Sequence, residues 1–212
     1  MTHRPERPGV CFVTSRTATA GRPILDVARA AIAGGCDLVQ VREKDLGGGP
    51  LLALAREIVE AAKSSPVRCS VVVNDRLDVA LAARAAGVHL PADGLPAGQV
   101  RRAAGKRWII GRSVHSLAEA RQAQKEGADY LVFGPVFETP GKASFGPPQG
   151  TDALRKVIEG VRLPVWAIGG VTPERAAGLR GLGIAGVAAI SCIAAAADPA
   201  GAVRDLREAL SG

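Results

Sequence analysis

Short, largely apolar runs alternate along this chain with helical stretches. Residues 38–44 show the pattern most sharply, because the run Leu-Val-Gln-Val ends abruptly in Arg-Glu-Lys. Such a run is typical of a strand in a parallel sheet covered on both faces, where charge is tolerated only once the strand emerges. Taken alone, the charged triplet indicates no more than a solvated loop. Its repetition along the chain makes it informative.

Four joints repeat the same order: a helical stretch, a break with glycine, then an apolar run. The glycines are Gly35, Gly87, Gly127 and Gly186. Each stands where a helix C-cap needs a left-handed residue, so we expect a helix followed at once by a strand.

The full pattern predicts strands near 9–15, 37–43, 70–75, 87–91, 108–114, 130–136, 164–170 and 186–191. It predicts helices near 23–33, 49–63, 77–86, 96–104, 116–126, 150–159, 173–180 and 199–210. Eight strands, each followed by a helix, predict an α/β protein with a single (β/α)8 TIM-barrel domain over residues 1–212, of which residues 1–8 form a flexible extension. A doubly wound open sheet is the alternative. Against it, no Gly-x-Gly-x-x-Gly turn follows the first strand.

The composition indicates the class of protein and its cellular compartment. The chain is 47% hydrophobic and 22% charged, as ordinary globular domains are. No apolar run reaches the roughly 18 residues of a membrane span, and the basic start leads into no apolar signal segment. Four widely spaced cysteines fit reduced thiols better than a disulfide framework. We therefore expect a cytoplasmic protein with no membrane partner, and a homo-oligomer stays open.

The net charge of +7 raises the question of a nucleic-acid partner. The basic residues are scattered through the helical stretches, and only 3% of residues are aromatic and able to stack on bases. We expect no nucleic-acid partner, and instead a small anionic substrate.

Barrel enzymes build their active sites at the C-terminal ends of the strands. The candidate side chains there are Gln40, Arg42, Lys44, Asn74, Asp75, Asp93, Ser113, His115, Thr139, Lys142 and Ser191. After the seventh strand, Gly169 and Gly170 let backbone amides approach an anion, and Pro173 opens a helix whose N-terminus adds positive potential. This predicts a phosphate site after strands seven and eight, for which a plain tight turn is the alternative.

Two further groups are complementary in charge. Arg42, Lys44 and Lys142 supply donors for a second, more highly charged phosphate group. Asn74 and Asp75 offer oxygen ligands of the kind that hold Mg²⁺ against pyrophosphate. For Asp75, a helix N-cap is the competing interpretation. A pyrophosphate that leaves during the reaction fits both groups.

Six segments, in this order, resemble the thiamine-phosphate synthase family, which includes the TenI-type thiazole tautomerases. They are Gln40-Val41-Arg42-Glu43-Lys44, Val73-Asn74-Asp75-Arg76, Gly87-Val88-His89-Leu90, Ser113-Val114-His115-Ser116, Gly134-Pro135-Val136-Phe137-Glu138-Thr139-Pro140 and Ala167-Ile168-Gly169-Gly170-Val171-Thr172-Pro173. The resemblance spans residues 10 to 210. It implies a TIM barrel that joins 4-amino-5-hydroxymethyl-2-methylpyrimidine pyrophosphate to a thiazole phosphate, or its carboxylated form, giving thiamine phosphate and pyrophosphate.

The resemblance also implies roles for individual residues. Gln40, Arg42, Lys44, Asn74 and Lys142 would grip pyrophosphate, Ser113 would lie near the pyrimidine, and Thr139, Gly170, Ile190 and Ser191 would face the thiazole phosphate. Asp75 would hold Mg²⁺, with Asp93 as the second metal residue. The catalytic residues would be Arg42, Lys44, Ser113, His115 and Lys142.

The chain departs from the synthase pattern at two places. Synthases usually carry a second metal-binding Asp at the position of Gly94, and here Asp93 stands one residue early. Gly141 replaces a threonine that synthases often have. These departures keep two alternatives open. One is a TenI-type tautomerase with His115 as proton shuttle, and the other is a non-catalytic regulator that binds a phosphate ligand.

Overall fold

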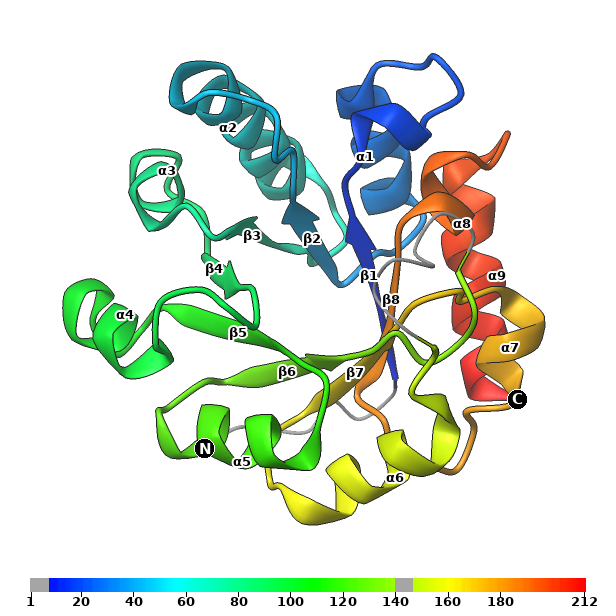
Figure 1. Cartoon of the computed structure of the whole chain (residues 1–212). Coiled ribbons are helices and arrows are strands. Elements are labelled where there is room, and N and C mark those ends of the chain that lie inside the picture. Colours follow the sequence, from blue (N-terminus) through cyan, green and yellow to red (C-terminus); the bar gives the residue numbers. More distant parts are fainter. Residues whose placement is uncertain (1–7, 140–146) are drawn as a thin grey trace.

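The computed structural model describes residues 8–139 and 147–212. Its eight parallel strands close into one barrel in chain order, and β8 pairs with β1. The strands are β1 Gly9–Val13, β2 Leu38–Val41, β3 Ser70–Asn74, β4 Gly87–Leu90, β5 Ile109–Val114, β6 Tyr130–Phe133, β7 Val165–Ile168 and β8 Gly186–Ala189. Figure 1 shows the strands around a common axis, with the helices outside them. The predicted (β/α)8 barrel is confirmed, and the open sheet is excluded.

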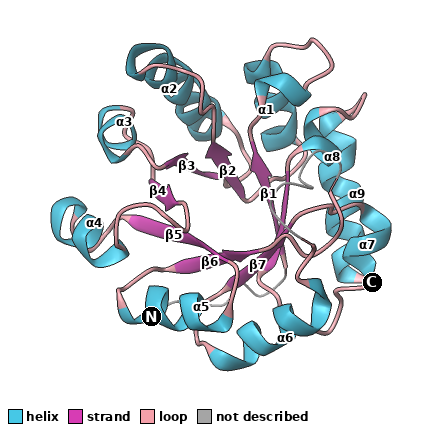
Figure 2. Ribbon diagram, viewed as in Figure 1, coloured by secondary structure: helices cyan, strands magenta, loops and turns pink. Residues whose placement is uncertain are grey.

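The helices follow the strands as expected, and Figure 2 shows them as an outer ring. They are α1 Ile24–Ala33, α2 Gly48–Ser64, α3 Leu77–Ala82, α4 Ala97–Ala104, α5 Leu117–Lys125, α6 Gly150–Gly160, α7 Pro173–Ala177 and α9 Pro199–Ser211. Two short elements escaped the sequence pattern: a 3-10 turn, η1 Arg16–Ala18, and a one-turn helix, α8 Ser191–Ala194. Both lie at the C-terminal end of the barrel, in the loops after β1 and β8.

Several strands end earlier than predicted, which frees polar residues for the site. The second strand was expected to reach residue 43 but ends at Val41. The reason is that the Arg42 amide donates to the Thr14 hydroxyl oxygen at 2.8 Å instead of to a neighbouring strand. Likewise α3 ends at Ala82, because Arg84 takes a left-handed φ of 54°.

The four glycine joints divide into two kinds. Gly35 and Gly127 are left-handed, with φ of 96° and 87°, as a C-cap requires. Gly87 and Gly186 instead open strands, which corrects the prediction for these two positions. Their reason for being glycine is steric, since a Cβ would lie 1.9 Å and 2.2 Å from the backbone oxygens of Ile109 and Gly9, respectively.

Two apolar layers hold the barrel together. The larger fills the space between strands and helices, and the smaller fills the barrel interior with residues such as Cys11, Val72, Tyr130 and Trp166. A barrel packed in this way leaves no channel, so a ligand can enter only at the loops. The interior layer thereby forms the floor of the site.

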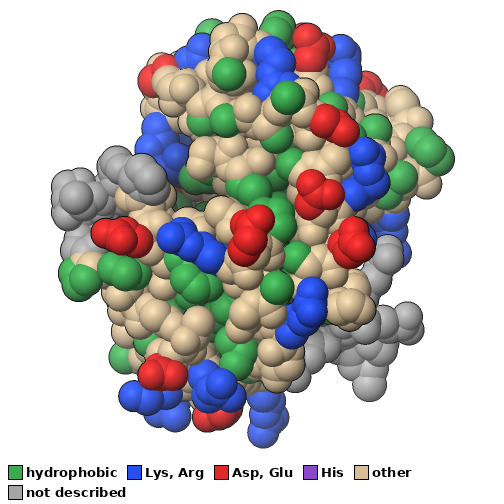
Figure 3. Space-filling model, turned by 90° about the vertical axis from the view of Figure 1, so that its right-hand side faces the viewer, with side chains coloured by type: hydrophobic (Ala, Val, Ile, Leu, Met, Phe, Trp, Pro, Cys, Tyr) green, Lys and Arg blue, Asp and Glu red, His purple; other side chains and the backbone are tan. Residues whose placement is uncertain are grey.

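The surface carries charges of both signs. On the face that α7, α8 and α9 form, Lys and Arg side chains are interspersed with Asp and Glu (Figure 3). Within residues 8–139 and 147–212, no helix has the length and apolar character that a membrane crossing would require.

Candidate active site

A cavity of about 460 Å³ opens at the C-terminal end of the barrel. Of the residues singled out in the sequence, its described wall contains Gln40, Arg42, Lys44, Asn74, Asp93, Ser113, His115, Gly169 and Ile190. They come from the ends of six different strands or the loops that follow them. A closed barrel brings all strand ends to one rim, so side chains far apart in sequence meet around a single cavity.

Gln40 and Asn74 begin the polar wall. They lie on the adjacent strands β2 and β3, and Gln40 Nε2 donates to Asn74 Oδ1 at 2.9 Å. Gln40 is 4% exposed, so this bond fixes the orientation of both amides. The Asn74 amide nitrogen is left as a donor toward the cavity.

Arg42 and Lys44 are free cations at this wall. In the described part of the chain, neither side chain makes a hydrogen bond or an ion pair, although Arg42 is half-buried. Burial lowers the pKa of Arg42 from its usual value, and the nearby Glu43 carboxylate partly opposes that shift. A half-buried guanidinium without a partner is matched to an anionic ligand.

A second cavity of about 310 Å³ adjoins the first and is acidic. Its wall has three carboxylates, of Glu43, Asp75 and Asp93, and two cations, Lys44 and Arg76. It shares Lys44, Asn74, Pro91 and Asp93 with the larger cavity. Basic donors and carboxylates therefore face adjoining spaces. Opposite charges arranged in this way fit an anion that brings a cation with it.

Asp75 is held in an unusual conformation. Its φ is 62°, which Asp tolerates better than most residues but which still costs about 1 kcal/mol or more. The N-cap of α3 is Arg76, without any side-chain cap, so the helix-cap interpretation of Asp75 is wrong. Within the described residues, its carboxylate accepts no hydrogen bond. It is exposed and faces the acidic cavity.

Gly94 marks where the synthase pattern has a carboxylate. A Cβ at this position would lie 3.2 Å from Asp75 Oδ1, so a side chain here would point to Asp75. It would also lie 2.8 Å from the ring of Pro91, too close without adjustment. Pro91 and Gly94 therefore fit each other, and Asp93 is the exposed carboxylate that this loop offers instead.

Arg112 holds the loop that carries Asp93. Its guanidinium donates to the carbonyl oxygens of Ala92 and Leu95, both at 2.7 Å, and of Gly94 at 3.3 Å. Arg112 was not among the predicted site residues. A charged residue inside the otherwise apolar run of β5 was the available signal.

His89 joins Ser113 to the barrel interior. His89 Nε2 lies 2.9 Å from Ser113 Oγ, and Nδ1 lies 3.0 Å from the Tyr130 hydroxyl. Burial, aided by the charges of Arg112 and Arg42, lowers the pKa of His89 to about 3, so the ring is neutral. A neutral ring has one donor and one acceptor, so the three groups form a fixed relay that orients Ser113.

Because His89 is buried and neutral, we expect the free energy of unfolding to depend on pH. The unfolded chain takes up the proton near pH 6.5, and the folded chain only near pH 3, so the unfolded state binds more protons between them. Stability should therefore fall as pH falls through that window, by up to about 1.4 kcal/mol per pH unit from His89 alone. Denaturant unfolding at pH 7, 6 and 5 measures the slope, which His89→Asn should reduce.

The same prediction has a check that needs no variant. The His89 ring signals in an NMR titration should show no protonation step between pH 8 and pH 5. A midpoint near 6.5 for this residue would refute the neutral relay.

His115 follows β5 and lines the same cavity. Its Nδ1 is 2.5 Å from the Gly134 carbonyl oxygen, and its amide donates to Glu119 Oε2 at 2.8 Å. A carbonyl oxygen only accepts, so Nδ1 carries a proton, and in the neutral ring Nε2 is the acceptor. The residue is held in place and can accept a proton.

The predicted phosphate site lies where the chain leaves β7 and β8. Gly169 and Gly170 have φ of 101° and 62°, and side chains there would collide with Pro135 and the Glu138 carbonyl oxygen, respectively. Gly169 lines the larger cavity, whereas Gly170 is outside its described wall. Pro173 is the first residue of α7, as expected, after Thr172 as the N-cap.

Two further predicted residues, Ser191 and Thr139, lie outside the described wall. Ser191 starts α8 at the surface, and Thr139 is half-buried with its hydroxyl donating to the Phe137 carbonyl oxygen at 3.2 Å. Lys142 lies outside the described residues, as does Gly141.

Comparisons with known proteins agree with this geometry. The family described as "Thiamine monophosphate synthase" matches residues 10–193. A thiamine-phosphate synthase of Moorella thermoacetica is 42% identical over 191 residues, 90% of each chain. A thiamine-phosphate synthase of Methanoculleus marisnigri is 43% identical over 199 residues, 94% of this chain and 93% of the relative.

Comparison with a solved structure supports the same family at the level of the fold. The thiamine phosphate pyrophosphorylase of Pyrococcus furiosus superimposes with a TM-score of 0.87 at 33% identity, covering 98% of this chain and 96% of its own. Sequence and structure thus point the same way over nearly the whole chain. The chain belongs to the thiamine monophosphate synthase family.

Proposed function

We propose that this protein is a thiamine-phosphate synthase, a transferase that joins hydroxymethylpyrimidine pyrophosphate to a thiazole phosphate with release of pyrophosphate. One observation carries the proposal. Arg42 and Lys44, two cations that have no ion-pair partner within the described residues, face a cavity that adjoins the carboxylates of Asp75 and Asp93. Family membership and the names of the relatives support the same reaction.

The reaction implied by the family resemblance is dissociative. The bond between the pyrimidine methylene carbon and the pyrophosphate oxygen breaks, and its electron pair leaves with pyrophosphate. The resulting pyrimidine methylene cation is captured by the thiazole nitrogen. A carboxylated thiazole additionally releases CO2.

The protein's contribution in this scheme is electrostatic. Arg42 and Lys44 neutralise charge on the leaving pyrophosphate, and Asn74 donates to it from a side chain that Gln40 holds. Ser113, oriented by His89, fixes the pyrimidine ring. The apolar floor, which includes Val132 and Ile168, keeps water from the cation before the thiazole captures it.

The acidic cavity fits Mg²⁺. Asp75 and Asp93 would hold the ion, which when bound would neutralise further charge on the leaving pyrophosphate. Among the described residues, no three His, Cys, Asp or Glu side chains are placed to hold a metal by themselves. Water and phosphate oxygens would complete the coordination, as is common for Mg²⁺.

The thiazole phosphate is assigned to the β7 and β8 end. The backbone of Gly169 approaches the cavity there, and α8 is the short extra helix that often follows the eighth strand at barrel phosphate sites. The assignment to this site remains a prediction for four residues, Thr139, Gly170, Ile190 and Ser191. The assignment of Lys142 to the pyrophosphate site also remains a prediction. A single domain over residues 1–212 and a cytoplasmic location also remain predictions.

The direct test is to incubate both substrates with the protein, with and without Mg²⁺, and to follow thiamine phosphate. We expect its formation to require Mg²⁺ and to be stopped by EDTA. Isomerisation of the thiazole phosphate that survives EDTA and is lost in His115→Ala would instead identify a tautomerase. Tight binding of a substrate without any turnover would identify a regulator.

The loop at Gly94 allows a gain-of-function prediction. Pro91→Gly with Gly94→Asp removes the steric conflict and places a carboxylate beside Asp75. The added anionic ligand should lower the Mg²⁺ concentration that gives half-maximal activity, by roughly tenfold. Pro91→Gly with Gly94→Asn is the matched control, since it has the same shape without the charge. Equal Mg²⁺ requirements in the two double variants would contradict a metal at Asp75.

A further inference from the structure

The loop after β1, residues 14–22, forms hydrogen bonds with the loop that carries Arg42 and Lys44 and with the C-terminal end of α8, without lining either cavity. On one side it reaches the loop that carries Arg42 and Lys44. The Thr14 hydroxyl accepts the Arg42 amide at 2.8 Å, and the Arg16 amide donates to Glu43 Oε2 at 3.0 Å. The Arg16 guanidinium also bonds Asp45 at 2.6 Å.

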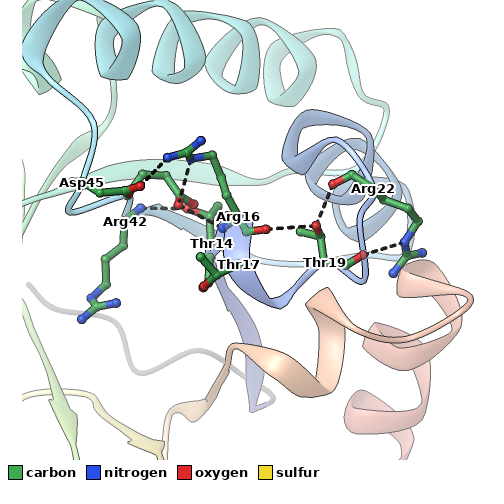
Figure 4. A network of polar contacts seen from close by, with 9 residues as sticks. Thr14, Arg16, Thr17, Thr19, Arg22, Arg42 and Asp45 are labelled. Atoms are coloured by element: carbon green, nitrogen blue, oxygen red, sulfur yellow. Dashed lines mark hydrogen bonds and ion pairs between the residues drawn. The ribbon is translucent and has the colours of Figure 1, made fainter. Parts of the chain in front are cut away.

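The charges of that second loop explain why such contacts matter. Residues 42–45 read Arg-Glu-Lys-Asp, so each cation has a carboxylate beside it in sequence. Arg16 engages both carboxylates, with its Nε 3.6 Å from Glu43 Oε2 and its Nη2 on Asp45. Within the described residues, Arg42 and Lys44 are left without ion-pair partners. In Figure 4 the Arg42 side chain points away from Arg16 and Asp45.

Without Arg16, the Glu43 carboxylate would lose its ion-pair partner. The Glu43 side chain is 4% exposed, and its Oε1 has no hydrogen-bond partner among the described residues. A buried carboxylate that loses its cation needs another. Arg42 and Lys44 flank Glu43 in the sequence, and Arg42 already interacts with it electrostatically. Pairing with either would take that cation from the substrate.

The other end of the same loop holds α8, which begins at Ser191. Arg22 Nη2 donates to the carbonyl oxygens of Ala196 at 2.6 Å and Ala194 at 2.9 Å, and Nη1 donates to that of Ala197 at 3.3 Å. Ala194 is the last residue of α8, so Arg22 satisfies carbonyls at and after the C-terminal end of this helix.

Thr19 joins the two ends. Its side chain is buried, and its one hydroxyl proton is shared between the carbonyl oxygens of Arg16, at 3.1 Å, and Arg22, at 2.7 Å. Arg22 Nε in turn donates to the Thr19 carbonyl oxygen at 3.2 Å. The chain of bonds in Figure 4 therefore runs from Asp45 through Arg16 and Thr19 to Arg22.

We propose that residues 14–22 form a strap that positions both substrate sites, with Arg16 keeping Arg42 and Lys44 available for pyrophosphate and Arg22 fixing α8 for the thiazole phosphate. Arg16 and Arg22 are thus positioning residues that do not touch substrate. The assignment of each arm to a substrate rests on the proposed function.

Steady-state kinetics of two variants test the strap. Arg16→Ala should raise the KM for the pyrimidine pyrophosphate by roughly tenfold or more and change that for the thiazole phosphate less than about twofold. Arg22→Ala should do the reverse. Arg16→Lys should recover part of the loss, because an ammonium can pair with one carboxylate but not span both.

Arg29→Ala is the control, because Arg29 forms only an exposed pair with Asp26 on α1. It should leave both KM values unchanged. A merely structural role of the loop would lower the melting temperature and change both KM values alike in Arg16→Ala and Arg22→Ala. That pattern, or unchanged kinetics in either variant, would overturn the proposal.

A binding measurement separates this proposal from the proposed function. If the wild-type protein forms no thiamine phosphate, the proposed function is wrong. The role of the strap can still be tested, because calorimetry measures the affinity for inorganic pyrophosphate in the presence of Mg²⁺. Arg16→Ala should weaken pyrophosphate binding by roughly tenfold, and Arg29→Ala should not. Equal affinity in wild type and Arg16→Ala would reject the strap regardless of the activity.

Discussion

Arg42→Met should lower kcat/KM for the pyrimidine pyrophosphate by a factor on the order of 10² to 10³, the loss that follows removal of one preorganised donor to developing charge. The guanidinium makes no hydrogen bond or ion pair within the described residues, and the backbone of Arg42 is held by Thr14. Methionine keeps most of the apolar stem. The effect should therefore be on turnover and pyrophosphate binding, with little change in the free energy of unfolding.

Steady-state kinetics with each substrate varied in turn measures this effect. Arg121→Met is the matched control, since Arg121 is exposed on α5, on the outside of the barrel. It should behave as wild type. Turnover in Arg42→Met within about threefold of wild type would remove Arg42 from the pyrophosphate site, whatever the overall reaction proves to be.

Asp75→Asn should abolish the stimulation by Mg²⁺ and lower turnover by a factor on the order of 10². Asparagine tolerates the left-handed φ of 62° as aspartate does, so the substitution removes charge without straining the backbone. Only the carboxylate is lost. Titration of activity with Mg²⁺ measures the result, and electron paramagnetic resonance of bound Mn²⁺ shows metal affinity without reference to turnover.

Asp26→Asn provides the comparison for Asp75→Asn. Asp26 forms an exposed pair with Arg29 on α1. It is outside the described walls of both cavities, so its loss should leave the metal requirement unchanged. Unaltered Mn²⁺ binding in Asp75→Asn would exclude Asp75 as a metal ligand.

Much of the site could be predicted from the sequence, because the C-terminal ends of all strands of a parallel barrel meet at one rim. Gln40, Asn74, Ser113 and Ile190 fall at or just after the ends of apolar runs, and the closed barrel brings them to one cavity. The same rule could not identify His89 or Arg112. Their roles come from partners on other strands and loops, which are Tyr130 for His89 and the carbonyl oxygens after β4 for Arg112.

The sequence by itself determined the barrel, its order of elements and its family, because apolar runs and glycine breaks act locally along the chain. Only the tertiary structure decided which charges are free. Arg42 stands next to Glu43 in the sequence yet makes no ion pair within the described residues, whereas Arg16, which has no acidic neighbour in the sequence, pairs with Glu43 and Asp45. The same is true of Asp75, which resembled a helix cap in sequence and is an exposed, strained carboxylate beside Asp93. Pairing depends on contacts between loops that are distant in sequence, and no local pattern records those contacts.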